Sequence, residues 1–219
     1  MNNLSVTKSN NLVDASYKLN VQAQKLILAC LGKIDSRAEI PNEITITAIE
    51  YGDLMGISNA RRDLYKAADH LFDAVITLKD NNEEIKLRWV QKSVLKKKGE
   101  GSVTITWSDD VLKYISVLKN RFTTYKLRHI SELKSGHSIR LYELLMRFNS
   151  TGARIISIAD FKSALGVSDK YPQFKELTRR VINPAIDELN KSSDLIVQYE
   201  SLKKGKTVTA LAFSFTQKD

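Results

Sequence analysis

The sequence predicts an α+β fold made of two similar units in tandem, and three observations lead to this prediction. The helix-start signals Thr47-Ala-Ile-Glu50 and Ser157-Ile-Ala-Asp160 lie 110 positions apart, and both place a hydroxyl and a carboxylate where they satisfy the first free amides of a helix. At the same offset, Gly56-Ile57-Ser58 matches Gly166-Val167-Ser168. Each copy is followed by two alternating segments around a turn rich in Lys and Gly, as in a hairpin. The chain is therefore predicted to be internally duplicated.

The first unit is predicted to contain three helices and a hairpin. Apolar residues three and four apart predict a helix over residues 20–33. The capping signal predicts a second helix from Thr47 to the turn at Gly56. A third helix follows, with an inward face made of Leu64, Ala68, Leu71 and Val75. Alternation predicts strands over 84–95 and 102–107, joined by a turn that contains Lys96, Lys97 and Lys98.

The second unit repeats this order. A helix over 138–148 precedes the capping signal at Ser157, and a long helix follows the turn at Gly166. Strands over 195–202 and 207–215 enclose the turn with Lys203, Lys204 and Lys206. Three helices followed by a hairpin describe a winged helix, in which a helix-turn-helix is joined to a β-hairpin wing. The predicted fold is thus two tandem winged-helix domains.

Between the units, Ser108 is predicted to cap a helix that runs to Leu118, and residues 120–136 show no strong periodicity. We place the domains at 1–122 and 123–219. The first carries 18 basic and 15 acidic residues, and the second carries 16 and 10. We therefore expect the second domain to supply more of the salt-dependent attraction to phosphates, although unequal acidic decoration of a solvated surface would give the same counts.

Composition narrows the class of protein. The chain has 219 residues, 42% of them apolar and 27% charged, with three prolines and nine glycines, which excludes disordered and collagen-like proteins. A net charge of +9 favours nucleic acid or an anionic membrane surface as partner. The sequence offers neither a spanning helix nor a secretory signal, so we expect a cytoplasmic protein without membrane contact. Cys30, the single cysteine, is predicted to be a packed thiol without a catalytic role.

The long helix of the second unit is the predicted recognition helix. Placing Phe174, Leu177, Val181, Ala185 and Leu189 inward leaves a polar outer stripe. Arg, Asn, Gln and Glu are the side chains that read base edges in a major groove. The predicted DNA contacts here are Lys170, Gln173, Lys175, Glu176, Arg179, Arg180 and Asn183. A surface ion pair between Glu176 and Arg180, four residues apart, is the alternative explanation for two of them.

The third helix of the first unit has a mixed outer face. Arg62 and Lys66 share this face with Asp69 and Asp73, whose charges repel phosphate. This helix is expected to bind DNA weakly or through its N-terminal end, and protein contact is a competing role. The predicted contacts of this unit are Asn59, Arg61, Arg62 and Lys66, with Lys96, Lys97 and Lys98 on the wing. The second wing adds Lys203, Lys204 and Lys206 as phosphate contacts, although lysine-rich turns are also common as plain solvated loops.

Searches for a catalytic or metal site give no candidate. Glu200 stands where the first glycine of a nucleotide-binding loop is required, ahead of Gly205-Lys206-Thr207. The three histidines form no His-x-His pair and no metal-spaced pair with cysteine, which argues against a DNA-nicking enzyme and against zinc. Pro184 lies inside the long helix, where it removes a hydrogen bond and is expected to kink it. We expect no enzyme activity, cofactor or metal.

Five segments of the chain resemble one known family, the Rep3-type initiators of theta-replicating bacterial plasmids, which bind repeats called iterons. They are Lys8-Ser-Asn-Asn-Leu-Val-Asp-Ala-Ser-Tyr17, Leu19-Asn-Val-Gln-Ala-Gln-Lys-Leu26, Ser138-Ile-Arg-Leu-Tyr-Glu-Leu-Leu145, Arg179-Arg-Val-Ile-Asn-Pro-Ala-Ile-Asp-Glu-Leu189 and Lys203-Lys-Gly-Lys-Thr-Val-Thr-Ala-Leu-Ala-Phe-Ser-Phe215. The likeness covers nearly the whole chain. Each segment alone is a weak signal, and together they are specific.

The resemblance implies a plasmid replication initiator that binds direct repeats in double-stranded origin DNA, with the C-terminal domain as the principal DNA reader and the N-terminal domain supplying secondary contacts. It further implies dimerisation through the N-terminal domain in equilibrium with a monomer, autorepression by the dimer, and recruitment of the host replication initiator and replicative helicase. The alternative is a winged-helix transcriptional repressor without initiator activity. Many relatives continue beyond the last strand, whereas this sequence ends at Asp219, and a missing tail would affect partner binding.

Overall fold

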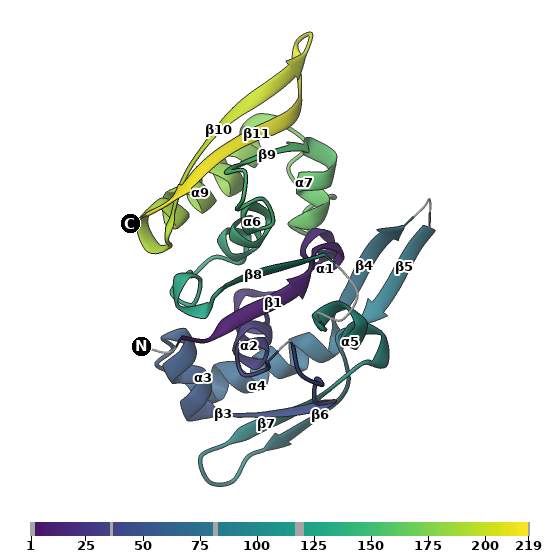
Figure 1. The fold of residues 1–219 in the computed structure, drawn as a ribbon, viewed down its shortest axis with the longest axis vertical. Coiled ribbons are helices and arrows are strands. Elements are labelled where there is room, and N and C mark those ends of the chain that lie inside the picture. Colours follow the sequence, from purple (N-terminus) through teal and green to yellow (C-terminus); the bar gives the residue numbers. More distant parts are fainter. Residues whose placement is uncertain (1–2, 36, 81–82, 117–120, 219) are drawn as a thin grey trace.

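A computed structural model describes residues 3–35, 37–80, 83–116 and 121–218 (Figure 1). The fold is α+β. The elements of the N-terminal half are, in chain order, β1 (Ser5–Ser9), α1 (Asn10–Asp14), β2 (Ser16–Tyr17), α2 (Val21–Gly32), β3 (Glu43–Thr47), α3 (Ala48–Met55), α4 (Ala60–Asp73), β4 (Val75–Asp80), β5 (Glu83–Arg88), β6 (Val90–Lys96), β7 (Ser102–Trp107) and α5 (Asp109–Ile115). Those that follow are β8 (Phe122–Lys126), η1 (Leu127–His129), α6 (Gly136–Met146), β9 (Ala153–Ser157), α7 (Ile158–Ala164), α8 (Phe174–Leu177), η2 (Thr178–Ile182), α9 (Asn183–Ser192), β10 (Leu195–Lys204) and β11 (Thr207–Gln217).

Both halves contain the same winged-helix arrangement, as the duplication predicts. A helix, a strand, two further helical segments and a hairpin follow one another as α2-β3-α3-α4-β6-β7 and again as α6-β9-α7-α8/α9-β10-β11. In each unit the strand before the helix pair joins the last strand of the hairpin, which gives antiparallel sheets of order β3-β7-β6 and β9-β11-β10. The equal topology confirms the predicted duplication.

The local signals of the duplicated segments are largely confirmed. Thr47 Oγ1 accepts a hydrogen bond from Glu50 N at 3.1 Å, and the Glu50 carboxylate accepts from Thr47 N at 2.8 Å, which completes a capping box. Ser157 likewise caps α7 through Asp160 N, but the Asp160 carboxylate bonds the Ser157 hydroxyl. Gly56 and Gly166 have φ of +62° and +68° at the equivalent turns, a conformation that side chains disfavour.

Two expectations for the first unit are wrong. Val75 is 37% exposed and begins β4, because the helix ends at Asp73 and the chain continues extended with Ile76 buried in the sheet β2-β4-β5. The predicted strand over 84–95 is two strands of different sheets. Trp89 separates them as a fully buried side chain that packs edge-on against Tyr17 at 5.2 Å between ring centroids. The β4-β5 hairpin is thus an addition to the winged helix.

The segment predicted to join the units without periodicity contains a strand. β8 pairs antiparallel with β1, with Ser5 opposite Lys126 and Ser9 opposite Phe122, and the two strands run side by side between the units in Figure 1. Ser108 caps α5 as predicted, but the helix ends at Ile115; its predicted end at Leu118 lies outside the described residues. Buried apolar residues form one cluster that extends through both units.

Candidate nucleic-acid interface

The predicted recognition helix runs from Phe174 to Ser192 as α8, η2 and α9. Its middle, η2, is a π turn in which Asn183 N donates to Thr178 O. This wider turn lies directly before Pro184, which has no N–H to donate. The extra residue brings both Val181 and Ile182 to the core. Of the predicted inward residues, Leu177, Val181, Ala185 and Leu189 are buried and Phe174 is half-buried.

The outer face of this helix carries most of the predicted contacts. Lys175, Arg179, Arg180 and Asn183 are exposed on it, and Lys170 and Gln173 are exposed in the loop before it. Glu176 is half-buried because it pairs with both arginines, at 2.9 Å to Arg179 Nη2 and 2.7 Å to Arg180 Nε. Hydrogen bonds from Arg180 and Arg179 lower the pKa of the Glu176 carboxyl. The free chain thus contains the predicted surface ion pair, extended to Arg179.

The second wing stands beside the start of this helix. Lys203, Lys204 and Lys206 are exposed around the tip glycine Gly205, whose φ is +64°. A groove of about 580 Å³ lies between the wing and α8, and Lys162 of α7 lines it together with Lys203 and Lys206. Elsewhere on the wing, the Tyr199 hydroxyl of β10 donates to Asn183 Oδ1 at 3.2 Å. Three ammonium groups around one groove suit a phosphate backbone.

The equivalent helix of the first unit, α4, has the predicted mixed face. Asn59, Arg62 and Lys66 are exposed, as are Asp69 and Asp73. Arg62 pairs with its neighbour Asp63 at 3.0 Å. The predicted cations of α4 are thus Arg61 and Arg62 at its start and Lys66 one turn further along.

The first wing is fastened to α4. The Arg61 guanidinium donates to the Lys97 carbonyl, and the Tyr65 hydroxyl donates to the Lys96 carbonyl at 2.8 Å. Gly101 permits this approach, because a Cβ there would lie 2.5 Å from the Tyr65 hydroxyl, and its φ is +76°. The side chains of Lys96, Lys97 and Lys98 remain exposed. Arg61 therefore positions the wing in the free chain, and its predicted DNA contact stays a prediction.

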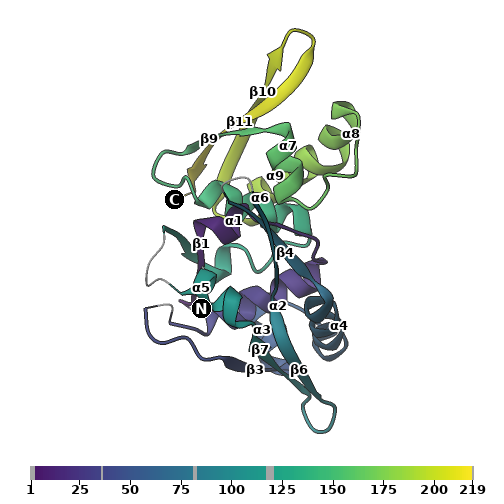
Figure 2. The same cartoon turned by 90° about the vertical axis from the view of Figure 1, so that its right-hand side faces the viewer.

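The two recognition helices lie on the same side of the molecule. In Figure 2, α4 and α8 both occupy the right-hand edge, and the wings β6-β7 and β10-β11 project beyond them at opposite ends. A duplex laid along this edge would meet both helices in succession. Fourteen of the predicted residues belong to the helices and wings of this side, and three, Asn59, Lys170 and Gln173, precede the helices.

Sequence reasoning missed Lys162 and Tyr65. Lys162 belongs to the short helix before the turn, and the pattern offers no sign that the wing lies beside it. Tyr65 is half-buried, and the spacing of Arg61 and Tyr65 on one helix face was the available signal for a shared contact.

Other kinds of site find no support in the described part of the chain. Within it, no group of three His, Cys, Asp or Glu is arranged to hold a metal ion. None of the described helices has the length and hydropathy to cross a membrane. Cys30 is fully buried, and burial raises the pKa of its thiol to about 12, which favours the unreactive protonated form.

Comparisons with known proteins agree with this geometry. Residues 5–146 match the family model for the first winged-helix domain of initiator replication proteins, and residues 157–215 match the model for the second. A replication initiation protein of Escherichia coli is 28% identical, over 97% of this chain and 70% of that protein. The PI protein of Escherichia coli is 29% identical, over 76% of this chain and 61% of that protein. The crystal structure of the Pi initiator protein in complex with iteron DNA superposes with a TM-score of 0.85 at 24% identity, over the full length of both chains.

Proposed function

The chain belongs to the Rep3 family of initiator replication proteins, and from this premise we propose that it binds direct repeats in double-stranded origin DNA to start plasmid replication. Membership favours an initiator over the repressor alternative. The observation that carries the proposed mode of binding is the placement of α4 and α8 on one side of the molecule, with a basic wing beside each (Figure 2). That arrangement suits one duplex gripped at two successive positions.

The helix from α8 to α9 is proposed to be the principal reader. Arg179, Arg180 and Asn183 lie exposed on its outer face, and they offer the donors and acceptors that distinguish guanine and adenine in the major groove. Lys203 and Lys206, together with Lys162, would hold the adjoining phosphates in the groove beside α8. The α4 helix and the first wing would add weaker contacts, because Asp69 and Asp73 share its exposed face.

The finer features of the proposal rest on the family. The domain boundary between residues 122 and 123 is proposed from the sequence pattern instead, and dimerisation is assigned to the first domain from the family. Recruitment of the host replication initiator and helicase, autorepression by the dimer, and a site of action in the bacterial cytoplasm belong to the same proposal. The chain would do this work by binding alone, without catalysis.

A replication assay tests the proposal directly. Cells are transformed with two plasmids. One keeps the origin but lacks its own initiator gene, and the second, unrelated plasmid supplies the chain. Stable maintenance is expected with the wild type and is expected to be lost with the double substitution Arg179→Ala/Arg180→Ala. Lys113→Ala is the matched control, since Lys113 is an exposed cation on α5 outside the predicted interface.

Binding measurements separate the two steps. Electrophoretic shifts with the origin duplex and with a random duplex of equal length give the specificity ratio of each variant. Wild-type chain that maintains no plasmid yet binds the origin specifically would favour the repressor. Equal affinity for both duplexes would overturn the proposed function.

A further inference from the structure

Arg140 is a buried guanidinium at the centre of the molecule. It lies on α6, which packs against α9 and lies between α9 and α4 in Figure 1, and it is 1% exposed. A guanidinium has five N–H donors in a fixed plane, and here every nitrogen is used. Its acceptors are Ala164 O for Nε, Glu143 Oε2 and the Tyr17 hydroxyl for Nη1, and Val13 O and Ala15 O for Nη2.

Apart from Glu143, which lies on α6 itself, these acceptors come from both units. Val13, Ala15 and Tyr17 belong to α1, β2 and the residue between them, in the N-terminal half. Ala164 is the last residue of α7, directly before the turn of the second helix-turn-helix. One side chain thus joins the first unit to the DNA-reading part of the second. The guanidinium also stacks on the Tyr17 ring, with Cζ 4.1 Å from the ring centroid.

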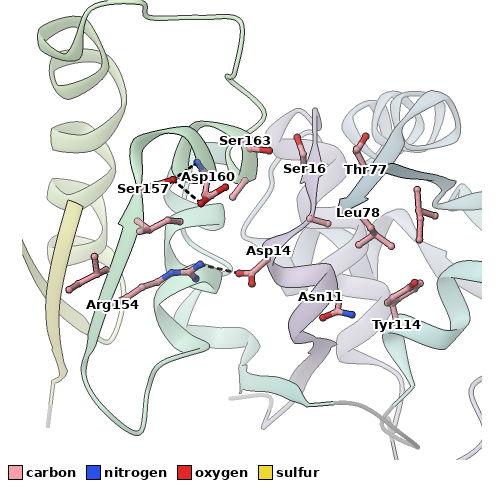
Figure 3. A pocket seen from close by; sticks show the side chains of 15 residues that line it. Asn11, Asp14, Ser16, Thr77, Leu78, Tyr114, Arg154, Ser157, Asp160 and Ser163 are labelled. Atoms are coloured by element: carbon pink, nitrogen blue, oxygen red, sulfur yellow. Dashed lines mark hydrogen bonds and ion pairs between the residues drawn. The ribbon is translucent and has the colours of Figure 1, made fainter. Parts of the chain in front are cut away.

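Neighbouring contacts reinforce this junction. Arg154 of β9 donates to Asp14 Oδ1 at 3.1 Å, and Figure 3 shows this pair beside a cavity of about 380 Å³ lined by both units. The turn glycine Gly166 packs directly on the first unit, since a Cβ there would lie 2.6 Å from Tyr17 O. The turn that leads into the recognition helix of the second unit therefore rests on β2.

Few residues separate the acceptors of Arg140 from α8 and from α2, the helix that packs along α4. The acceptor Ala164 lies ten residues before Phe174, the first residue of α8. On the other side, Tyr17 lies four residues before Val21, where α2 begins, and α2 packs along α4. A change in the angle at Arg140 would therefore move one recognition helix relative to the other.

The chemistry of this junction is better suited to fixing an arrangement of the two units than to adding stability. Burying ionised groups is costly, and apolar side chains of similar volume often hold two surfaces together as well or better. What a fully bonded guanidinium adds is direction, because its planar fork fits one arrangement of acceptors. We propose that Arg140 is a positioning residue that fixes the distance and angle between α4 and α8, and thereby the spacing of the two DNA segments that the chain contacts on one duplex. This inference rests on the proposed function.

The test uses the full chain and a duplex selected by the wild type from a random pool. A hydroxyl-radical footprint first defines the two contacted segments, and one or two base pairs are then inserted between them. One inserted base pair turns one segment by roughly 35° against the other. The insertion penalty is the ratio of the dissociation constants for the inserted and the original duplex. The wild type is expected to show a penalty of about tenfold or more, equivalent to about 1.4 kcal/mol.

Two variants and one control address Arg140. Arg140→Lys keeps the charge and loses the fork, and Tyr17→Phe keeps the ring and removes the hydroxyl that accepts from Arg140, so it remains informative if Arg140→Lys does not fold. Tyr142→Phe is the control, because it removes a buried phenolic hydroxyl from the same helix without altering any acceptor of Arg140. Small-angle scattering of each variant without DNA measures the distance between the two units. A variant that is less stable but still folded would give the same distance, so this measurement separates positioning from stability.

The outcomes separate this inference from the proposed function. A folded Arg140→Lys or Tyr17→Phe is expected to lower the insertion penalty at least about threefold and to broaden the distribution of interatomic distances, with Tyr142→Phe unchanged. Penalties equal to that of the wild type would overturn the role of Arg140. A wild type without any insertion penalty would overturn it too, while specific binding still stood. A wild type without preference for the selected duplex over random DNA would overturn the proposed function itself.

Discussion

Lys8 Nζ on β1 lies 2.6 Å from Glu143 Oε1 on α6, although 135 residues separate the two in the chain. Neither side chain is more than 3% exposed. The Tyr125 hydroxyl of β8 donates to the same oxygen at 2.6 Å. The pair thus fastens both strands of the β1-β8 sheet to α6 and balances one buried charge with another.

Replacing Lys8 should be far more costly than replacing a lysine of a surface pair. Lys8→Met leaves the Glu143 carboxylate with Arg140 as its remaining cationic partner, and we expect the free energy of unfolding to fall by about 3 kcal/mol. Urea denaturation followed by circular dichroism measures this loss. Lys18→Met is the control, because Lys18 pairs with Asp169 at 3.1 Å on the surface and should contribute about 1 kcal/mol or less. Equal losses in the two variants would contradict the prediction.

The same carboxylate predicts a loss of stability in acid. Burial by itself would raise the pKa of Glu143, but the charges of Lys8 and Arg140 outweigh it and hold the pKa at about 2, against an ordinary value of 4.5. Such a group stabilises the fold fully above its unfolded pKa, and the contribution disappears as the pH falls from about 4.5 to about 2. The difference in unfolding free energy between wild type and Glu143→Gln should shrink by about 3 kcal/mol over that range. A difference that stays constant from neutral pH to pH 2 would contradict it.

Patterns local to the sequence predicted the winged helices well. Capping residues, glycine turns and periodicity act within a few residues, so α2, α3, α6, α7, the second wing and the last strand of the first wing could be predicted from their own segments. The first strand of each sheet, β3 and β9, was missed although Ile44 and Ile46 alternate with exposed residues. Each is only five residues long and pairs with a strand more than 50 residues away.

The junction between the units could not be predicted in this way. Lys8, Arg140 and Glu143 are charged residues, which are exposed by default, and their partners come from distant elements. Two of the segments that resemble the family contain these three residues. A matching segment does not tell whether a charge is buried. The break between β5 and β6 at Trp89 was missed for a similar reason, since it depends on the packing of Trp89 against the distant Tyr17.

Cys30 should behave as a probe of global unfolding. Its thiol is fully buried in α2, and burial raises its pKa to about 12, so both access and thiolate are lacking in the native state. We expect iodoacetamide to label it at a rate that follows the population of unfolded chain in urea. Mass spectrometry of the labelled protein measures the rate. Rapid labelling without denaturant would contradict the burial of α2.

Tyr65 should control the mobility of the first wing. Tyr65→Phe removes the hydrogen bond to the Lys96 carbonyl, which should lower the unfolding free energy by about 1 kcal/mol and speed amide exchange at residues 96–101. Tyr114→Phe on α5 is the control, a half-buried tyrosine away from this wing. If exchange at the wing tip is unchanged in Tyr65→Phe, the wing is held by other contacts.

Glu176 decides between the two roles considered for the recognition helix. If its carboxylate accepts from a cytosine amino group, Glu176→Gln should lower the ratio of specific to random affinity by about fivefold or more, because the neutral amide oxygen is a weaker acceptor than the carboxylate. If the carboxylate only pairs with Arg179 and Arg180, its neutralisation frees two cations and should strengthen binding to all duplexes, with a steeper dependence on salt. We expect the first result, since the acidic residue lies among the side chains that we propose to read bases on the outer face. Electrophoretic shifts at several salt concentrations measure both quantities. Asp187→Asn is the control, an exposed carboxylate further along α9, and a ratio that falls equally in both variants would assign the effect to charge alone.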